Sequence, residues 1–378
     1  MEDKIIEKLN QMGQQHITKR LDNNENLRGQ ICKIDFDEIM KLYKGTKKNT
    51  PILEKYFEGI GYVEKDKLSM EEYGELEKIG NDVIKNGKYA VVTMAGGQGT
   101  RLGHKGPKGT FDIGLESHKS LFELLSDGLK EQGRKYGVTI PWFIMTSEEN
   151  NDQTIEFFAK HRFFGYEKDK NIFFFKQGEL PMVDTEGKIL IGENGLIKEA
   201  ADGHGGIYEA LVKNGMTKKM RELGVEWVFI GGVDNCLVKM VDPVLMGIAI
   251  DKKVTAAGKS VVKANPKEKV DPVLMGIAIQ KHVTAAGKSV VKSNPGEKVG
   301  VFCKKNGRPS VVEYTEIPKE MAEAKDERGE LIYGESHILC NLFNIDAVER
   351  MGTKPLPYHS AFKKATYIDK NGNKVVPD

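Results

Sequence analysis

The chain has 378 residues, and its 57 basic residues nearly balance its 55 acidic ones, so the net charge is +2. This balance argues against binding to nucleic acid or to a membrane surface through bulk charge. The sequence contains no run of about 18 apolar residues, and its first residues lack the apolar core of a signal peptide. We therefore expect neither a membrane span nor a secretory leader.

The cysteines are scattered along the chain and show no metal-binding spacing. They are Cys32, Cys236, Cys303 and Cys340. Cysteines at such irregular spacing are typical of proteins from a reducing compartment, so we expect free thiols and a cytoplasmic location.

Residues 1–86 are rich in charge and place apolar residues at helical spacing. The last such series, Leu76, Ile79 and Val83, is followed by Gly87, which suits the C′ position that ends many helices. This pattern predicts a helical N-terminal extension over residues 1–86 that packs against the domain after it.

The stretch 89–114 combines a short strand, a glycine-rich loop and two cations. Ala90 to Met94 has the length and β-branched content of a buried strand. The glycines that follow are Gly96, Gly97, Gly99 and Gly103. Glycine lets the backbone approach a ligand closely, and successive amides in such a loop attract anions. Because Arg101 and Lys108 add positive charge, the stretch predicts a cradle for a polyphosphate.

The spacing of these glycines excludes two familiar phosphate loops. A Walker A loop requires G-x-x-x-x-G-K-[ST], and no glycine here begins one. A dinucleotide-binding loop requires G-x-G-x-x-G, but Leu102 occupies the position of the third glycine. A plain surface turn is the structural alternative, and the two cations and the Pro107-Lys108-Gly109 sequence argue against it.

Strands and helices alternate after the loop, which predicts βαβ units and a mostly parallel sheet. Ser120 and Glu123 have the spacing of a capping box at the start of a helix that runs to about Tyr136. The predicted strands are Ile140–Met145, Ile172–Lys176 and Val225–Ile230. Ligands of parallel sheets bind beyond the carboxyl ends of the strands. The glycine loop, Gln177 and Asp234-Asn235 all fall at such ends.

Residues 241–269 and 270–298 are two copies of one 29-residue block, and the copies differ at four positions. The pattern of each copy predicts a helix and then a short strand. The helices would be 243–250 and 272–279, and the strands 260–263 and 289–292. Two repeats are too few to form a solenoid with a shared core. We expect one copy to occupy the native place and the other to be looped out or poorly packed, and the sequence does not decide which.

Two later strands carry a polar residue within an apolar run. Glu313 lies in the predicted strand 310–314, and Asn341 lies in the apolar segment 336–344. A buried polar side chain needs a hydrogen-bonding partner, so both residues are candidates for ligand contact.

Several separated motifs match one known family in order. GGQGTRLG at residues 96–103 and GPKG at residues 106–109 resemble the nucleotide loop of the UDP-sugar pyrophosphorylases, most closely the UDP-N-acetylglucosamine pyrophosphorylase branch. The resemblance extends from about residue 50 to the end of the chain. It implies an α/β fold with a Rossmann-like, GT-A-like nucleotidyltransferase domain over residues 87–354, built on a mixed, mostly parallel sheet with flanking helices.

The resemblance also implies a lysine-bearing segment and a C-terminal domain beyond the end of this sequence. We therefore interpret residues 355–378 as the start of a truncated C-terminal region. Within it, Lys364 aligns with a basic pair near the phosphates and is a candidate catalytic cation.

The resemblance assigns the phosphates of UTP to the glycine loop. The residues that would hold these phosphates and the ribose are Gly96, Gly97, Gly99, Thr100 and Arg101. Arg101 and Lys108 would act as catalytic cations, and the structural alternative for Lys108 is a solvated surface lysine. Gln177, whose amide can both donate and accept, would read the uracil edge, unless it is only a polar strand end.

A second turn, Gly203 to Gly206, matches a segment that lies against the base. His204, Gly205 and Gly206 would bind substrate there. At position 204 this branch often has asparagine, whereas glucose-using relatives have histidine, as this chain does. The structural alternative for His204 is an ordinary turn residue.

Asp234 is the predicted metal ligand. A carboxylate at a strand end that faces phosphates is a usual ligand of Mg²⁺, and the alternative for Asp234 is a helix N-cap. Asn235 would contact the ribose or the sugar. By the same resemblance, Glu313 and Asn341 would contact the sugar hydroxyls and the N-acetyl group.

The implied activity is uridylyl transfer, with UTP and a sugar 1-phosphate as partners and Mg²⁺ as cofactor. The chain would form UDP-N-acetylglucosamine and pyrophosphate from UTP and N-acetylglucosamine 1-phosphate. One alternative keeps the reaction and changes the sugar to glucose or galactose. The other is a catalytically impaired fragment that binds UTP or a UDP-sugar, which the repeat and the missing C-terminal segment favour.

Overall fold

The computed structural model describes most of the chain. The described residues are 2–46, 57–58, 62–236, 238–262, 275–278, 290–291, 301–305, 308–312, 317–327, 329, 331–333, 339–354, 365–369 and 371–376. The chain divides into two compact units. Unit 1 contains Met1–Pro51, Gly178–Gly205 and Leu356–Asp378, and unit 2 contains Ile52–Gln177 and Gly206–Pro355.

Unit 1 consists of short helices and two short hairpins around a small apolar core. Its helices are α1 (Glu2–Gln11), α2 (Gln15–Thr18), α3 (Glu25–Ile31) and α4 (Phe36–Thr46). Its strands are β6 (Glu179–Pro181), β7 (Glu199–Ala201), β15 (Tyr367–Ile368) and β16 (Lys374–Val375). Leu9, Ile17 and Leu27 come from three different helices and are fully buried. They share one cluster with Ile189 and Ile191, so segments distant in sequence form a single core.

Unit 2 is built on a nine-stranded mixed sheet. The strands are β2 (Tyr62–Glu64), β3 (Tyr89–Met94), β4 (Trp142–Thr146), β5 (Ile172–Lys176), β8 (Trp227–Gly232), β9 (Ala256–Val262), β10 (Met275–Ala278), β11 (Val290–Val291) and β14 (Cys340–Asn344). Their order is β2-β10-β9-β14-β8-β3-β4-β5, with β11 paired to β9. The neighbours β8, β3, β4 and β5 are parallel, and β14 is antiparallel to β8. The predicted α/β class with a mixed, mostly parallel catalytic sheet is confirmed.

Three further strands of unit 2 form a separate antiparallel sheet. They are β1 (Phe57–Glu58), β12 (Val301–Lys305) and β13 (Arg308–Val312), in the order β1-β12-β13. Val301, Cys303 and Val312 are buried in a small cluster of their own with Met321 from α11 (Lys319–Glu323).

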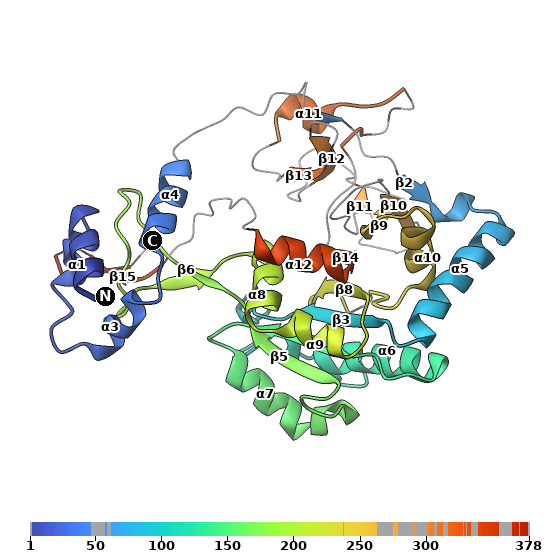
Figure 1. The fold of residues 1–378 in the computed structure, drawn as a ribbon, viewed down its shortest axis with the longest axis horizontal. Helices are drawn as coiled ribbons and strands as arrows, with labels where there is room; N and C mark the ends of the chain where they lie inside the picture. The colour runs from blue at the N-terminus through green and yellow to red at the C-terminus, as the bar shows by residue number, and fades with distance from the viewer. Residues whose placement is uncertain are drawn as a thin grey trace. The chain divides into compact units, whose positions relative to one another are not determined.

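Helices cover both faces of the large sheet (Figure 1). The first face carries α5 (Met70–Lys85), α6 (Leu121–Tyr136), α7 (Asn151–Lys160) and α10 (Pro243–Asp251), and the second carries α8 (Ile207–Lys213), α9 (Met216–Glu222) and α12 (Ile345–Thr353). Successive strand residues alternate between the two cores, so that Val91 faces the first and Val92 the second. Every residue of β3 is therefore buried, as expected for a strand covered on both faces.

Most predicted strand and helix starts agree with the structure within two residues. β4 begins at Trp142 rather than Ile140, because Pro141 has no amide hydrogen to donate to a neighbouring strand. β8 begins at Trp227 because the Val225 amide still donates to Met220 at the end of α9. Ser120 accepts a hydrogen bond from the Glu123 amide, as expected at the start of α6.

The helices of residues 1–86 are divided between the two units. α1 to α4 lie in unit 1, whereas α5 packs in the core of unit 2. A complete capping box of Ser69 and Glu72 begins α5, and Gly87, at φ +69°, follows its end as predicted for a C′ residue.

The two copies of the repeat adopt different structures. The first copy forms α10, which matches the predicted helix, and β9, which begins at Ala256, before the predicted strand start at 260. In the second copy, β10 pairs antiparallel with β2 and β9, so the helix predicted over 272–279 is wrong at Met275–Ala278. Hydrogen bonding to two neighbouring strands outweighs the local helical pattern there. β11 falls within the predicted strand 289–292 and runs parallel to β9.

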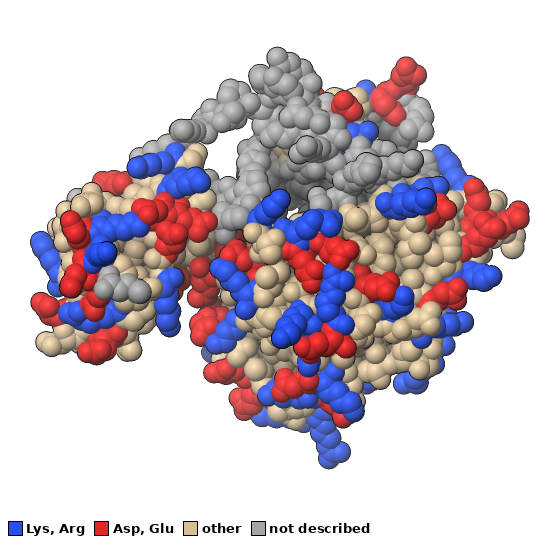
Figure 2. Space-filling model, in the orientation of Figure 1, with Lys and Arg blue, Asp and Glu red and all other residues tan. Residues whose placement is uncertain are grey.

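The surface carries charges of both signs. Figure 2 shows Lys and Arg side chains interspersed with Asp and Glu, which agrees with the small net charge. Among the helices that the structure describes, none is both long and apolar enough to cross a membrane.

Candidate active site

Three of the predicted polar clusters follow parallel strands and lie at one edge of the sheet. Met94 at the end of β3 pairs with Gly232 at the end of β8 and with Met145 in β4. Lys176 at the end of β5 pairs with Thr146. Because these carboxyl ends are level, the glycine loop, Gln177 and Asp234-Asn235 all begin at this edge, as the sequence predicts.

The loop after β3 folds back on itself and brings Lys108 beside Gly97. The Gly99 amide donates to the Gly106 carbonyl (2.9 Å), and the Lys108 amide donates to the Gly97 carbonyl (3.0 Å). The Gly99 carbonyl accepts from the amides of Leu102 and His104. The short 3₁₀ helices η3 (Thr100–Leu102) and η4 (Lys108–Thr110) sit within this closed loop.

The loop leaves a run of backbone amides available to an anion. In the part of the chain that the structure describes, the amides of Gly96, Gly97 and Gln98 donate to no protein group. Gly97 is exposed, and Gly96 and Gln98 are half-buried. Successive free amides attract anions, so this loop suits phosphate oxygens.

Lys108, in the loop after β3, and Asp234, in the turn after β8, form an ion pair. The Lys108 Nζ lies 2.6 Å from an Asp234 carboxylate oxygen. The Asp234 side chain is 61% exposed, whereas that of Lys108 is 26% exposed. The pair places one cation and one accessible carboxylate next to the free amides, although the two residues are far apart in sequence.

The Gln177 side chain packs directly against Gly96. A Cβ at Gly96 would lie 2.4 Å from the Gln177 side-chain oxygen, far inside contact distance. The backbone amide of Gln177 donates to the Thr146 carbonyl, which fixes the residue just after the end of β5. The predicted uracil-reading residue and the predicted phosphate loop are therefore in direct contact.

Asn235 lies in the turn after β8, and Asn341 lies in β14, the strand that pairs with β8. Asn341 is 7% exposed in the middle of β14, opposite Ile230 of β8. The Asn235 side-chain amide is 4.0 Å from the Cys340 sulfur, so the turn after β8 contacts β14.

The other predicted residues are placed as follows. Thr100 is exposed at the start of η3, and the position of the Arg101 side chain is outside the description. Gly206 is the N-cap residue of α8 in unit 2, whereas His204 and Gly205 belong to unit 1. Glu313 and Lys364 lie outside the described residues.

Sequence patterns do not single out Asn150, which contacts the loop from the inside. Its side chain is fully buried and donates to the carbonyls of Ala95 (2.9 Å) and Gly97 (3.3 Å). The only sequence signal is an asparagine just before a helical pattern, and that signal normally indicates a helix N-cap.

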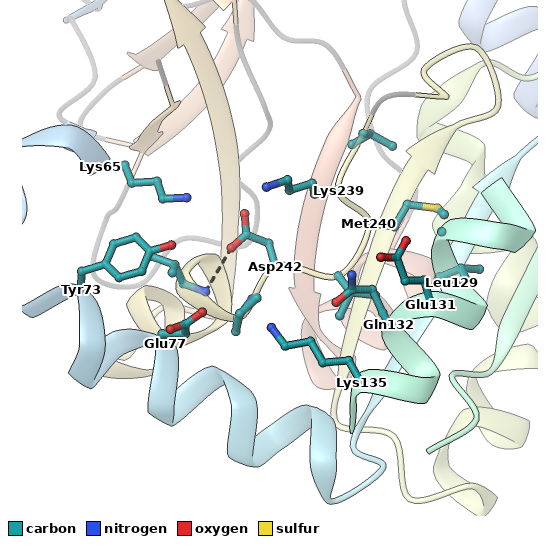
Figure 3. Close-up of a pocket in the computed structure, with 15 residues that line it drawn as sticks. Lys65, Tyr73, Glu77, Leu129, Glu131, Gln132, Lys135, Lys239, Met240 and Asp242 are labelled. Carbon is teal, nitrogen blue, oxygen red and sulfur yellow. Dashed lines mark hydrogen bonds between the residues drawn. The ribbon is translucent and has the colours of Figure 1, made fainter. Parts of the chain in front are cut away.

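A cavity of about 470 Å³ lies elsewhere in unit 2, between α5, α6 and the segment before α10 (Figure 3). Figure 3 shows Lys65, Lys135 and Lys239 around Asp242. The Asp242 carboxylate caps α10 by accepting from the amides of Val244 and Leu245, so its charge has a structural role. As far as the structure describes the chain, no predicted site residue lines this cavity.

The donor set is compatible with one hard cation held jointly with a substrate. Among the described residues, no cluster of three or more His, Cys, Asp and Glu side chains forms a closed metal site. Mg²⁺ commonly uses one or two carboxylates together with phosphate oxygens. The single accessible carboxylate of Asp234 beside an anion cradle fits that pattern.

Comparison with known proteins identifies the family. A family model described as UTP--glucose-1-phosphate uridylyltransferase matches residues 35–377. The chain belongs to this family. The match to the uridylyltransferase family model includes both the glycine loop and the Lys108–Asp234 pair, and the predicted resemblance is confirmed.

Individual uridylyltransferase relatives are similar over much of the chain. A probable UDP-N-acetylglucosamine pyrophosphorylase of Dictyostelium discoideum is 33% identical over 94% of this chain and 71% of its own length. The UDP-N-acetylglucosamine diphosphorylase 2 of Arabidopsis thaliana is 36% identical over 77% of this chain and 56% of its own length. The crystal structure of the Trypanosoma brucei UDP-N-acetylglucosamine pyrophosphorylase with an inhibitor matches with a TM-score of 0.74 at 28% identity, covering 99% of this chain and 72% of that one.

The chain is shorter than these family members. It spans between 55% and 71% of the length of the curated relatives.

Proposed function

We propose that this chain is a UTP–sugar-1-phosphate uridylyltransferase that forms UDP-N-acetylglucosamine and pyrophosphate from UTP and N-acetylglucosamine 1-phosphate. The observation that carries the proposal is the Lys108–Asp234 pair beside the free amides of the glycine loop. A cation, a carboxylate and an anion cradle at one sheet edge are what a polyphosphate substrate and its metal require. The names of the relatives support N-acetylglucosamine as the sugar.

The chemistry needs positioning rather than a general base. An oxygen of the sugar 1-phosphate, already an anion at neutral pH, attacks the α-phosphorus of UTP, and the bond to pyrophosphate breaks. Charge develops on phosphoryl oxygens, which preorganised donors stabilise. In this proposal the amides of Gly96 and Gln98 and the Nζ of Lys108 supply those donors, together with Arg101 and Lys364.

Asp234 is the proposed ligand of Mg²⁺. When bound, the ion would neutralise part of the phosphate charge. Lys108, which pairs with Asp234, would then be available to the phosphates.

The remaining residues are proposed to select the base and the sugar. Gln177 would read the uracil, and its contact with Gly96 would couple the base to the phosphates. Thr100 and Asn235 would contact the ribose, and Asn341 the sugar. Additional proposed contacts come from Gly97, Gly99, His204, Gly205, Gly206 and Glu313.

The reaction can be tested by measuring pyrophosphate release with UTP, Mg²⁺ and, separately, the 1-phosphates of N-acetylglucosamine, glucose and galactose. We expect release with N-acetylglucosamine 1-phosphate above the other two. Faster release with glucose 1-phosphate would instead support the alternative that His204 favours. UTP binding without any release would support the impaired binding fragment.

Lys108→Ala and Asp234→Ala should each lower kcat/KM by about 10²- to 10³-fold, the usual effect of removing one preorganised charge contact. Lys105→Ala is the matched control, because Lys105 is an exposed cation of the same loop. Circular dichroism should show an intact fold in all three variants, since ion pairs at the protein surface contribute little stability. Wild-type rates in either test variant would remove this mechanism.

A cytoplasmic location, expected from the scattered cysteines, is part of the same proposal. Fluorescence microscopy of the tagged chain in its own cells tests it, and a signal confined to an organelle would contradict it.

A further inference from the structure

Asn150 occupies a helix N-cap position but does not cap its helix. It directly precedes α7, and its side chain makes no hydrogen bond to the first turn of that helix. Instead its Nδ2 donates to the carbonyls of Ala95 and Gly97, and its Oδ1 accepts from the Ser147 amide at 2.9 Å. A fully buried asparagine is thus directed at the glycine loop.

These hydrogen bonds fix the direction of two peptide groups. In a trans peptide the carbonyl of one residue and the amide of the next point in opposite directions. Because the Ala95 carbonyl is turned inward to Asn150, the Gly96 amide must point outward. In the same way, the inward Gly97 carbonyl turns the Gln98 amide outward.

The loop has few other restraints on these two peptide groups. Glycine tolerates most backbone conformations, so the peptides on either side of Gly96 and Gly97 could reverse at little steric cost. The Lys108 amide also donates to the Gly97 carbonyl. Among the described residues, the Asn150 side chain is the donor to the Ala95 carbonyl.

We propose that Asn150 is a positioning residue for the nucleotide: it holds the Ala95 and Gly97 carbonyls inward so that the Gly96 and Gln98 amides face the triphosphate of UTP. The proposal rests on the uridylyltransferase function proposed above. Through the Gly97 carbonyl, which Asn150 and the Lys108 amide share, the same side chain also sets the backbone position of Lys108.

Asn150→Asp and Asn150→Ala test the proposal. The aspartate keeps the size and the acceptor for Ser147, but it places a carboxylate oxygen against two carbonyls; the alanine removes the donor. We expect the Kd for UTP, measured by calorimetry, and the KM for UTP to rise at least tenfold in both variants. The KM for the sugar 1-phosphate should change less than twofold, because the affected peptides face the nucleotide.

Asn151→Asp is the matched control. Asn151 is the next residue. Its Oδ1 accepts from the Thr146 hydroxyl, a contact that aspartate preserves, and aspartate loses only the exposed hydrogen bond from Nδ2 to Asp152. UTP affinity should therefore stay within twofold of the wild type. Equal losses for UTP and sugar phosphate, or unchanged UTP affinity in folded Asn150 variants, would overturn the proposal.

An NMR measurement on the wild-type chain covers the case in which the variants fail to fold. Titration with UTP should shift the amide protons of Gly96 and Gln98 downfield, as expected for new hydrogen bonds to phosphate. Unchanged amide shifts with UTP bound would overturn the role of Asn150 alone. A wild-type chain that binds no UTP would overturn the proposed function as well.

Discussion

The repeat contains two segments of identical sequence, Pro243 to Ile250 and Pro272 to Ile279. Their described residues have different secondary structures. The first segment forms most of α10, a helix buried against α5. Four residues of the second, Met275–Ala278, form β10 beside β9. Since local propensity is the same in both segments, their neighbours must determine the difference.

The place that α10 occupies accepts one helix. A Cβ at Gly80 would lie 1.8 Å from the Pro243 carbonyl oxygen, and a Cβ at Gly247 would lie 1.9 Å from that of Leu76. The helices therefore pack backbone to backbone at two glycines. With this place filled, the second copy has apolar β-branched residues and a neighbouring strand edge, which favour pairing.

The largest expected effect comes from Gly247→Val, with Gly276→Val as its counterpart in the second copy. Valine at 247 would collide with the Leu76 backbone, so we expect a loss of about 3 kcal/mol or more in the free energy of unfolding. Valine suits a strand, so the change at 276 should cost less than about 0.5 kcal/mol. Urea unfolding of both variants gives the comparison.

An unchanged free energy of unfolding in Gly247→Val would contradict this prediction. It would mean that the second copy can replace the first against α5. A double variant, Gly247→Val with Gly276→Val, would then lose the stability that each single variant keeps.

A smaller effect is expected at the helix caps. Asp242 is 6% exposed and accepts hydrogen bonds from Val244 (3.0 Å) and Leu245 (3.1 Å). Asp242→Ala should therefore cost about 1 to 2 kcal/mol. Asp271→Ala, the same change in the second copy, should cost less than about 0.5 kcal/mol. Thermal unfolding distinguishes them, and equal losses would show that both aspartates cap helices.

The smallest difference is expected between two chains that each lack one copy of the repeat. Deletion of 241–269 or of 270–298 leaves chains that differ only at the four positions where the copies differ. Two of these positions in the first copy, Asp251 and Lys253, are exposed. The two shortened chains should agree within about 0.5 kcal/mol in stability and bind UTP equally. A large loss relative to the full chain in both would show that β10 and β11 contribute to the fold.

The regular part of the fold is predictable because its signals are local. Ala90 to Met94 and Ile172 to Lys176 are apolar runs that end in glycine or polar residues, and both are strands with polar site residues at their ends. The strand β10 of the second copy is not predictable, because its sequence is the same as that of part of α10 and only the occupied place beside α5 distinguishes the two copies.

The site is predictable to the extent that its residues share one stretch of chain. The glycine loop follows directly from residues 96–109. The contact of Lys108 with Asp234 spans more than a hundred residues and depends on the order of β3 and β8 in the sheet. Asn150 escapes prediction because its position has an ordinary explanation as a helix cap, and only its hydrogen bonds to the loop reveal another role.

The extra copy also lengthens the connection between β9 and β12, which runs over residues 263–300 and would be 29 residues shorter with a single block. The entropy lost on closing a chain segment grows only with the logarithm of its length, by about 0.6 kcal/mol per doubling. A flexible connection roughly four times as long would therefore cost about 1 kcal/mol, before the pairing of β10 and β11 within it is counted. Polymer statistics thus allow the large sheet to persist around an insertion of this size.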